Sequence, residues 1–506
     1  MFRRRCFSIV MPVLAAVLAV SVAQAEGPVP GDVFKELKWI ANGGCAGAWR
    51  IASDACANLY FPGQNSAGQN YSFPGEIDKT DATKVEVSVQ KVMCHDGTTG
   101  FQVQMNNSGT WHDLGYGDGS TIPGDTYQYM TYPAIEIPLS EINDGTNQIK
   151  MQVSAGSGWC PQNLVYGGTL RAYYPQGTGS HPTGSITAPA NNAEITTTSV
   201  DLEVSVEGDV AQVDYIYNGY GVNWEGEGNY EQWHYHMYAG EIMHHIGTAE
   251  GAPWSVTWNT EWVPSQPDGT VEVCARIVGT NGMVYMTDAI TLYLQRTGHS
   301  AEIGEPTGTP AAWVTRSGGK SVNFTLEGDP SNGTAAMVCW SSWGDLCGGG
   351  NVNGTGFGCG SDLGGYNNRF HEADLDPGAL NNGSNTLTID GGGHHGMEVN
   401  WPGPMVVVQY STDDPPVSVR AAKPEFAVRR EEQIATVRNV NARSFSVDVA
   451  ASGSHGVRVV NATGRVMAAR QGANPQSHTF EGLAGGVYFV RVVSTGGTRT
   501  STVTIE

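Results

Sequence analysis

The stretch that decides the fold class is residues 453–506, which read GSHGVRVVNATGRVMAARQGANPQSHTFEGLAGGVYFVRVVSTGGTRTSTVTIE. Valines alternate with polar residues at 457–460 and at 487–492. Alternation with a period of two is typical of half-buried β-strands. The Gly485-Gly486 pair interrupts the pattern and predicts a turn. The stretch therefore predicts a small β-sandwich at the end of the chain.

The order of these elements resembles a known family. Val459-Val460-Asn461-Ala462-Thr463-Gly464-Arg465 reads as a strand and its turn, and Leu483-Ala484-Gly485-Gly486-Val487-Tyr488 opens the next strand. With these motifs, residues 426–506 resemble the C-terminal sorting domain of type IX secretion cargo. The resemblance implies an export address and a partner, the secretion machinery of the outer membrane. The alternative is an ordinary terminal β-sandwich.

The N-terminus agrees with export. Arg3-Arg4-Arg5 is charged, residues 7–22 are apolar, and Ala23-Gln24-Ala25 has the A-x-A form of a cleavage site. This order of features predicts a signal peptide over residues 1–25. No other segment reaches the apolar length of a membrane helix, so we expect no membrane span. The expected location is secreted or cell surface.

Composition predicts the fold class of the remaining chain. The 506 residues include 67 glycines, and only 15% of all residues are charged. Turn dipeptides recur, and no long stretch shows helical periodicity. We therefore predict an all-β protein built of tandem β-sandwich domains, some jelly-roll-like and one Ig-like.

Linkers rich in glycine, serine and proline divide the chain into modules. The predicted modules are 26–176, a jelly-roll-like sandwich; 185–297, an Ig-like sandwich with a long loop; 310–411, a further sandwich; and 426–506, the sorting domain. The first module resembles carbohydrate-binding modules in its layout. The second opens with Ile186-Thr187-Ala188-Pro189 and resembles the Ig-like modules of exported bacterial proteins.

The third predicted module echoes the first. Gly145-Thr146-Asn147-Gln148-Ile149 has a counterpart in Gly383-Ser384-Asn385-Thr386-Leu387. In each, a turn with glycine and asparagine leads into an alternating strand. The match predicts an internal repeat.

Charge limits the partners that the chain can bind. Between Gly27 and Asp414 there are 13 Lys and Arg residues against 42 Asp and Glu residues. A segment this acidic repels phosphate backbones, so we expect no nucleic acid binding. It is also poorly matched to anionic lipids and polyuronates. A neutral polymer or a cation suits it better.

Cysteine usage is consistent with export, where disulfides form. Eight cysteines follow the predicted signal peptide. In the first module the preferred pairs are Cys45 with Cys56 and Cys94 with Cys160, although the sequence allows three connectivities. The other four do not pair obviously, and we expect a buried free thiol among them; they are Cys274, Cys339, Cys347 and Cys359.

The most unusual stretch is Tyr217–Trp262, which is far longer than an Ig-like strand connection requires. Its many aromatic residues argue against disorder. In one interpretation, aromatic rings stack on sugar faces while carboxylates bind hydroxyl groups. The residues predicted to bind substrate in this way are Trp224, Glu225, Tyr230, Glu231, Trp233 and Tyr235. In a second interpretation, the aromatic residues are the packed core of the loop itself.

A third interpretation of the same loop is a metal site. His234 and His236 would share one strand face, and His244 could complete a copper or zinc site. His394, His395 and Met397 form a second set of soft ligands, for which a surface turn is the blander interpretation. Asp374 and Asp376 could bind calcium through oxygen ligands. No cofactor follows with certainty from these patterns.

Known enzyme motifs are absent from the sequence: there is no GxSxG, HExxH, P-loop or EF-hand pattern. The sequence therefore leaves open whether the protein is an enzyme. It favours a secreted or surface protein that binds a neutral polysaccharide, within a polysaccharide-degrading system. The alternatives are a glycan-active enzyme, either a hydrolase or a histidine-metal oxidoreductase, with its site at 217–262, and a structural or adhesion protein.

Overall fold

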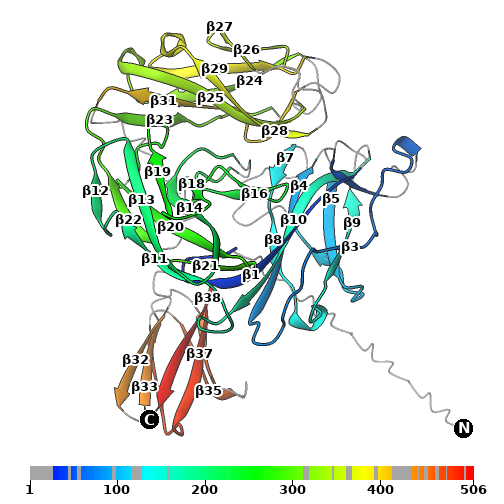
Figure 1. The fold of residues 1–506 in the computed structure, drawn as a ribbon, viewed down its shortest axis with the longest axis vertical. Helices are drawn as coiled ribbons and strands as arrows, with labels where there is room; N and C mark the ends of the chain where they lie inside the picture. The colour runs from blue at the N-terminus through cyan, green and yellow to red at the C-terminus, as the bar shows by residue number, and fades with distance from the viewer. Residues whose placement is uncertain are drawn as a thin grey trace, which may run out of the picture. The chain divides into compact units, whose positions relative to one another are not determined.

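The computed structural model describes residues 27–43, 47–53, 59–93, 98–115, 128–156, 160–224, 226, 228–267, 269–310, 318–344, 347–359, 367–392, 397–412, 435–441, 444–449, 454–461, 466–473, 476–494 and 497–505. The chain divides into two compact units, Met1–Val419 and Arg420–Glu506 (Figure 1). Regular structure is almost entirely β-strand, arranged in several separate sheets. The predicted all-β fold of tandem β-sandwiches is confirmed.

The first module is a sandwich of two antiparallel sheets. One sheet contains β1 (Val33–Ile40), β2 (Trp49–Ala52), β4 (Lys84–Met93), β7 (Tyr129–Thr131), β8 (Ala134–Glu136) and β10 (Gln162–Tyr174). The other contains β3 (Tyr71–Ser72), β5 (Thr98–Met105), β6 (His112–Asp113) and β9 (Gln148–Gly156). Their facing side chains form one core; Val85, Val87 and Val89 of β4, for example, meet Val103 and Met151 from the opposite sheet.

The second module has the same two-layer construction. One layer is β11 (Thr183–Ala188), β13 (Ser199–Glu207) and β19 (Ser255–Asn259). The other is β12 (Ala193–Ile195), β14 (Val210–Tyr220), β15 (Glu231–Trp233), β18 (Gly247–Ala249), β20 (Thr270–Gly279), β21 (Met283–Met286) and β22 (Ile290–Leu294). A separate hairpin consists of β16 (His236–Tyr238) and β17 (Glu241–Met243). Along β13, Val200, Leu202 and Val204 are buried between exposed neighbours, as the alternating sequence requires.

A strand pairing joins the first two modules into one sheet. β1 pairs antiparallel with β21, with Val33 opposite Tyr285 and Lys35 opposite Met283 (Figure 1). Backbone hydrogen bonds therefore cross the boundary between the modules.

Buried charges lie at the same boundary. Glu36 of β1 contacts Arg171 at 2.7 Å and Arg276 at 3.0 Å, and Arg276 contacts Asp214 at 2.8 Å. Burial alone would raise the pKa of Glu36, but attraction to Arg276 and Arg171 holds it well below the usual range. Two acidic and two basic groups thus compensate one another, which a buried ion network needs.

The third module is also a two-sheet sandwich. Its first sheet is β23 (Ser300–Gly304), β25 (Gly333–Trp343), β28 (Asn368–Leu375), β30 (Glu398–Val399) and β31 (Met405–Tyr410). Its second is β24 (Gly319–Leu326), β26 (Gly349–Val352), β27 (Thr355–Phe357) and β29 (Gly383–Asp390). Within the described residues, short 3-10 helices occur at η1 (Leu139–Glu141), η3 (Pro330–Asn332) and η4 (Pro377–Ala379).

The echoed turns of the first and third modules carry the same hydrogen bonds. Asn147 donates to the carbonyls of Asn143 and Gly145, while its Oδ1 accepts from the Asn106 amide. In the third module, Asn385 donates to the carbonyls of Asn381 and Gly383, while its Oδ1 accepts from the Asn353 amide. Asn106 and Asn353 both have positive φ, at 49° and 52°. The same set of hydrogen bonds therefore stabilises the start of β9 in the first module and of β29 in the third.

The described cysteines are in two states. Cys347 and Cys359 are bonded to each other, whereas Cys274 and Cys339 are free and buried. Cys160 is also disulfide-bonded. Because Cys45, Cys56 and Cys94 lie outside the described residues, the two pairs expected in the first module stay predictions.

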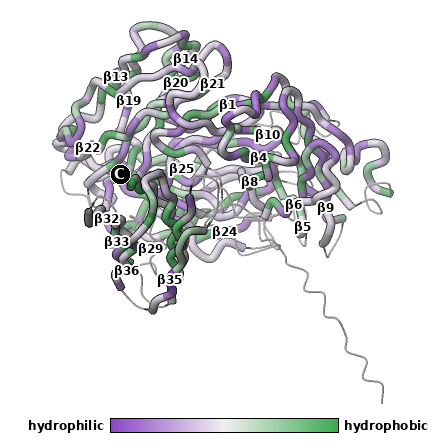
Figure 2. The backbone as a smooth tube through the Cα atoms, turned by 90° about the horizontal axis from the view of Figure 1, so that it is seen from below, coloured by the Kyte–Doolittle hydropathy of each residue, from purple (hydrophilic) through white to green (hydrophobic). Residues whose placement is uncertain are grey.

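The second unit, considered by itself, is a seven-stranded sandwich. Its sheets are β32 (Ala435–Asn441), β33 (Ser444–Val449) and β36 (Gln476–Glu481), and β34 (Ser454–Asn461), β35 (Val466–Ala473), β37 (Gly486–Ser494) and β38 (Gly497–Ile505). Phe445 and Phe480 stack in its core at 5.3 Å. Figure 2 shows hydrophobic and hydrophilic residues interspersed along the strands, which is the pattern of sandwich strands with one buried face.

Candidate functional site

The long stretch Tyr217–Trp262 is folded and packed. It contains the strand β15, the β16–β17 hairpin and β18, and it lies against residues of the first and third modules. Its packing therefore joins the three modules of the first unit.

The centre of this junction is a cluster of aromatic and imidazole rings. Trp224 stacks on His244, with ring centroids 4.4 Å apart. His236 lies 4.7 Å from the ring of Tyr132, a first-module residue, and 5.2 Å from the ring of Phe370 in the third module. We call Tyr132, Trp224, His236, His244 and Phe370 the junction cluster.

Hydrogen bonds between modules surround the junction cluster. Tyr238 donates its hydroxyl proton to the carbonyl of Asn368 at 3.0 Å, and the Ala239 amide donates to Gln90 Oε1 at 2.7 Å. The amide of Trp401 donates to the carbonyl of Gln128 at 2.7 Å. These bonds satisfy the Tyr238 hydroxyl group and the backbone amides of Ala239 and Trp401 between the modules.

The residues predicted to bind sugar are distributed over different environments. Trp224 packs against one hydrophobic cluster, with Tyr220 and Tyr230, whereas Trp233 and Tyr235 pack against another. Tyr230 is 5% exposed. Glu231 is half-buried, and Glu225 lies outside the described residues.

Trp224 and Trp233 are both half-buried, although their sequence neighbours are mostly polar. Packing against the neighbouring modules, which local sequence does not reveal, removes the rings from water.

The predicted histidine triad is not assembled. His234 stacks on Tyr217, and its Nε2 lies 2.9 Å from the carbonyl oxygen of Gly219. His236 and His244 lie close together, with ring centroids 4.9 Å apart, but within aromatic packing. Among the described residues, no group of three or more His, Cys, Asp or Glu side chains could hold a metal ion. The i, i+2 pair His234 and His236 is thus split between two environments, and a metal site at His234, His236 and His244 stays a prediction.

The other residues predicted to bind a metal ion either bond to groups within the protein or lie outside the described residues. The Asp376 side chain accepts from the Gly378 amide at 2.9 Å and caps η4. Met397 is fully buried and its sulfur accepts from the Trp340 indole at 3.2 Å. His394 and His395 lie outside the described residues.

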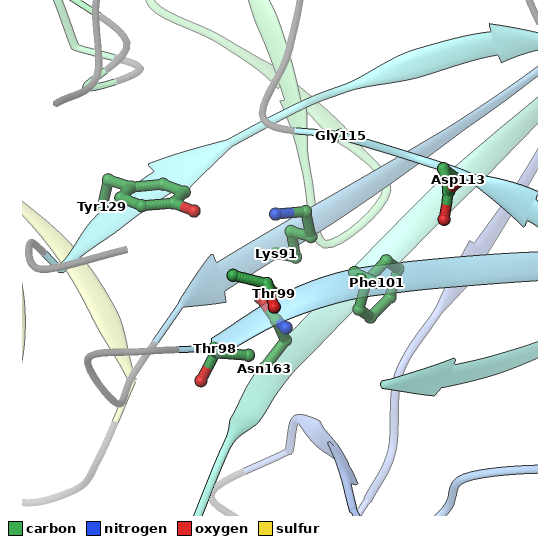
Figure 3. A pocket seen from close by; sticks show the side chains of 9 residues that line it. Lys91, Thr98, Thr99, Phe101, Asp113, Gly115, Tyr129 and Asn163 are labelled. Atoms are coloured by element: carbon green, nitrogen blue, oxygen red, sulfur yellow. The ribbon is translucent and has the colours of Figure 1, made fainter. Parts of the chain in front are cut away.

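A pocket between the two sheets of the first module gathers groups suited to ligand binding. Its volume is about 300 Å³, at the lower end of the range for small-molecule sites. It is lined by Lys91, Thr98, Thr99, Gly100, Phe101, Asp113, Gly115, Tyr129 and Asn163 (Figure 3). These residues come from β4, β7 and β10 of one sheet, and from β5, β6 and the residues after β6 on the other side.

Lys91 follows from the alternation of β4. Val85, Val87 and Val89 point into the core, and Lys91 continues the same face at the point where the pocket begins. Its side chain is 2% exposed, and its Nζ lies 5.5 Å from the ring centroids of both Phe101 and Tyr129. Burial lowers the pKa of Lys91 to about 7. Sequence reasoning missed this signal: Lys91 occupies a core-facing position in a strand whose preceding core-facing residues are valines.

Asn163 supplies a second polar group. It is 1% exposed, and its Oδ1 has no hydrogen-bond partner among the described residues. Buried amide oxygens are normally satisfied, and neighbouring atoms cover this one, so Asn163 contributes to the pocket lining through other atoms of its side chain. Nearby, Asp113 Oδ1 accepts from Gln102 at 2.8 Å, and Thr98 Oγ1 accepts from the Gln162 amide at 2.9 Å.

Comparison with known families identifies one of the modules. Residues 182–275 match the family model described as a bacterial Ig domain. The first unit is thus a multi-module β-sandwich assembly whose second module is of the bacterial Ig type. No curated protein matches the chain.

Solved structures show only distant similarity. The fibronectin(III)-like modules of Clostridium thermocellum CbhA align with 64% of this chain and 94% of their own, at 8% identity and a TM-score of 0.16. Ruminococcus gnavus β-glucuronidase aligns with 43% of this chain and 40% of its own, at 10% identity and a TM-score of 0.14. BuGH86wt in complex with neoagarooctaose aligns with 43% of this chain and 31% of its own, at 14% identity and a TM-score of 0.18. At these scores none of them bears on function.

No helix within the described ranges is long and apolar enough to cross a membrane.

Proposed function

We propose that this is an exported protein that binds a neutral polysaccharide through the pocket of its first module. The observation that carries the proposal is the pocket between the two sheets, which brings Lys91 and Asn163 together with Phe101 and Tyr129. The proposal keeps the function expected from the sequence and moves its site away from the aromatic loop.

The chemistry of the pocket suits a sugar. A sugar presents hydroxyl groups, which donate and accept hydrogen bonds, on a ring with apolar C–H faces. Lys91 and Asn163 offer hydrogen-bond donors, while Phe101 and Tyr129 provide apolar walls. A few convergent polar groups set among aromatic side chains are the usual composition of a small-ligand site.

Charge favours a neutral glycan. Lys91 and Asp113 bring opposite charges to the pocket lining. The chain as a whole has a formal net charge of −22. A polyanion would be repelled at long range by such a protein.

Export would follow from the two ends of the chain. We infer that residues 1–25 are a signal peptide and that residues 426–506 address the protein to the secretion machinery of the outer membrane. The separate sandwich of Arg420–Glu506 supports this role, because a sorting domain has to fold apart from its cargo. The protein would then act in the medium or at the cell surface.

The junction cluster would have a supporting role. By packing the first, second and third modules together, it would fix the orientation in which the pocket meets a polymer. This assigns the unusual aromatic content of residues 217–262 to rigidity instead of to sugar stacking.

The test is affinity electrophoresis of the full chain through gels that contain single neutral polysaccharides, such as β-glucan, galactan, mannan and xylan. The expected result is retardation in at least one gel and loss of that retardation in Asn163→Leu. Leu59→Ala is the control, because Leu59 is 70% exposed and outside the pocket. Release of reducing sugar from a retarding polymer would favour a glycan-active enzyme. Failure to bind any polymer would leave a structural or adhesion role.

A further inference from the structure

We propose that the first-module pocket binds the terminal sugar residue of a glycan chain, so that the protein recognises chain ends and not chain interiors. This inference rests on the proposed function and adds to it the part of the polymer that is bound. It follows from the size of the pocket, from its position between the sheets and from the groups that line it.

The size of the pocket matches one sugar residue. Its volume is about 300 Å³. A volume at the lower end of the range for small-molecule sites suits one sugar residue better than several consecutive ones. A bound chain interior would need a groove that accommodates several consecutive residues.

Because the pocket lies between the two sheets, a glycan chain can enter it only with one of its ends. The lining comes from both sheets, with Lys91, Tyr129 and Asn163 on one side and Thr98 and Phe101 on the other (Figure 3). All five side chains are buried, at 5% exposure or less. The pocket thus reaches between the layers of the sandwich, whereas a site for chain interiors would run across the outer face of one sheet. A polymer can place only its last residue among these side chains.

The polar groups can distinguish a terminal residue. A terminal sugar has a free hydroxyl group where an interior residue has a glycosidic oxygen without a proton. Lys91 and Asn163 in the lining can hydrogen-bond that hydroxyl group, and an interior residue would lose part of this interaction. The pocket would therefore select an end by hydrogen bonding as well as by shape.

Titration calorimetry of the full chain would measure this selectivity. The probes are the methyl glycoside, the disaccharide and the tetrasaccharide of the sugar whose polymer retards the protein. We expect the three dissociation constants to agree within about threefold, because only one residue enters the pocket. Mild random cleavage of the polymer should raise its binding capacity in proportion to the number of new ends. Affinity that increases more than tenfold from the methyl glycoside to the tetrasaccharide, with capacity independent of cleavage, would overturn the inference.

Two variants connect the measurement to this pocket. Asn163→Leu should weaken binding of the methyl glycoside at least tenfold, and Thr99→Trp should block the pocket by filling it from a half-buried position. The circular dichroism spectrum and the thermal midpoint report whether each variant folds, and two variants at different positions guard against misfolding of one.

The outcomes separate the two proposals. If both folded variants bind as the wild type does while Trp224→Ala does not, the protein binds glycans at the junction cluster and the inference about the pocket is wrong. If the wild type binds none of the polymers or glycosides, the proposed function fails and the inference fails with it.

Discussion

The indole of Trp224 and the imidazole of His244 stack with their planes only 11° apart, and the ring of Phe370 meets both of them edge-on. Trp224 and His244 belong to the second module, and Phe370 belongs to the third. The stack therefore joins two modules, with Trp224 and His244 in loop segments and Phe370 in strand β28. Its role in stability can be separated from any role in binding.

Replacing Trp224 with alanine should destabilise the first unit by about 2–4 kcal/mol, somewhat less than a fully buried tryptophan would. The reason is loss of the stack and of packing between modules. Urea unfolding followed by circular dichroism would measure it, with Leu59→Ala as an exposed control. Unchanged stability would show that the stack is not part of the structural junction.

Trp258 should behave as an ordinary core residue. It is 4% exposed and packs on Tyr217 with ring centroids 5.1 Å apart. Trp258→Ala should cost about 3–5 kcal/mol of unfolding free energy. Thr257→Ala is the matched control, because Thr257 precedes it on β19 and is exposed. A loss of less than about 1 kcal/mol would contradict the assignment of Trp258 to the core.

Because of Lys91, the free energy of unfolding should increase as the pH rises above 7. Burial lowers its pKa from 10.5 to about 7, so between these values the unfolded chain binds a proton that the folded chain does not. The contribution of this group to stability therefore rises with pH across that window. From pH 7 to pH 9 the wild type should gain about 2 kcal/mol relative to Lys91→Met. If the unfolding free energies of the two proteins changed equally with pH, the pKa of Lys91 would not be lowered.

His371 should make the third module sensitive to acid. Burial, with a smaller effect from Arg369, lowers the pKa of His371 from 6.5 to about 4, and its ring stacks on Trp340 at 4.8 Å. The folded state binds fewer protons between pH 4 and 6.5, so this contribution to stability is lost as pH falls through that window. The loss is at most about 3 kcal/mol and should be absent in His371→Gln. Thermal melts at pH 4, 5 and 7 would measure it, and equal acid sensitivity of both proteins would refute it.

Residues 26–414 should fold without the C-terminal unit. The chain divides between Val419 and Arg420, and the last described strand of the first unit, β31, ends at Tyr410. The fragment should be soluble and unfold cooperatively, which size-exclusion chromatography and a thermal melt would check. An insoluble or molten product would mean that the C-terminal sandwich belongs to the core of the rest.

The β-sandwich fold could be predicted because its signal is local. Val200, Leu202 and Val204 alternate with exposed residues in β13, and this pattern appears in the sequence without any knowledge of partners. Trp258 of β19 is likewise buried between the exposed residues Thr257 and Asn259.

The site could not be predicted in the same way because it depends on contacts between distant residues. Trp224 has polar sequence neighbours, yet Phe370 and His244 bury part of its ring. His234 and His236 are two residues apart, yet they lie in different packing environments. Asn163 becomes conspicuous only when the fold brings it into the same pocket lining as Lys91.

The pairing of β1 with β21 has a consequence for how this protein could have been inherited. Multi-domain proteins commonly evolve by recombination at linkers, and residues 177–184 look like such a point. A cut there would leave β1 as an open strand edge, a liability for aggregation. It would also separate Glu36 from Arg276 and leave buried charges unmatched. The first two modules would therefore have to be exchanged between genes as a pair, even though the sequence presents them as separate units.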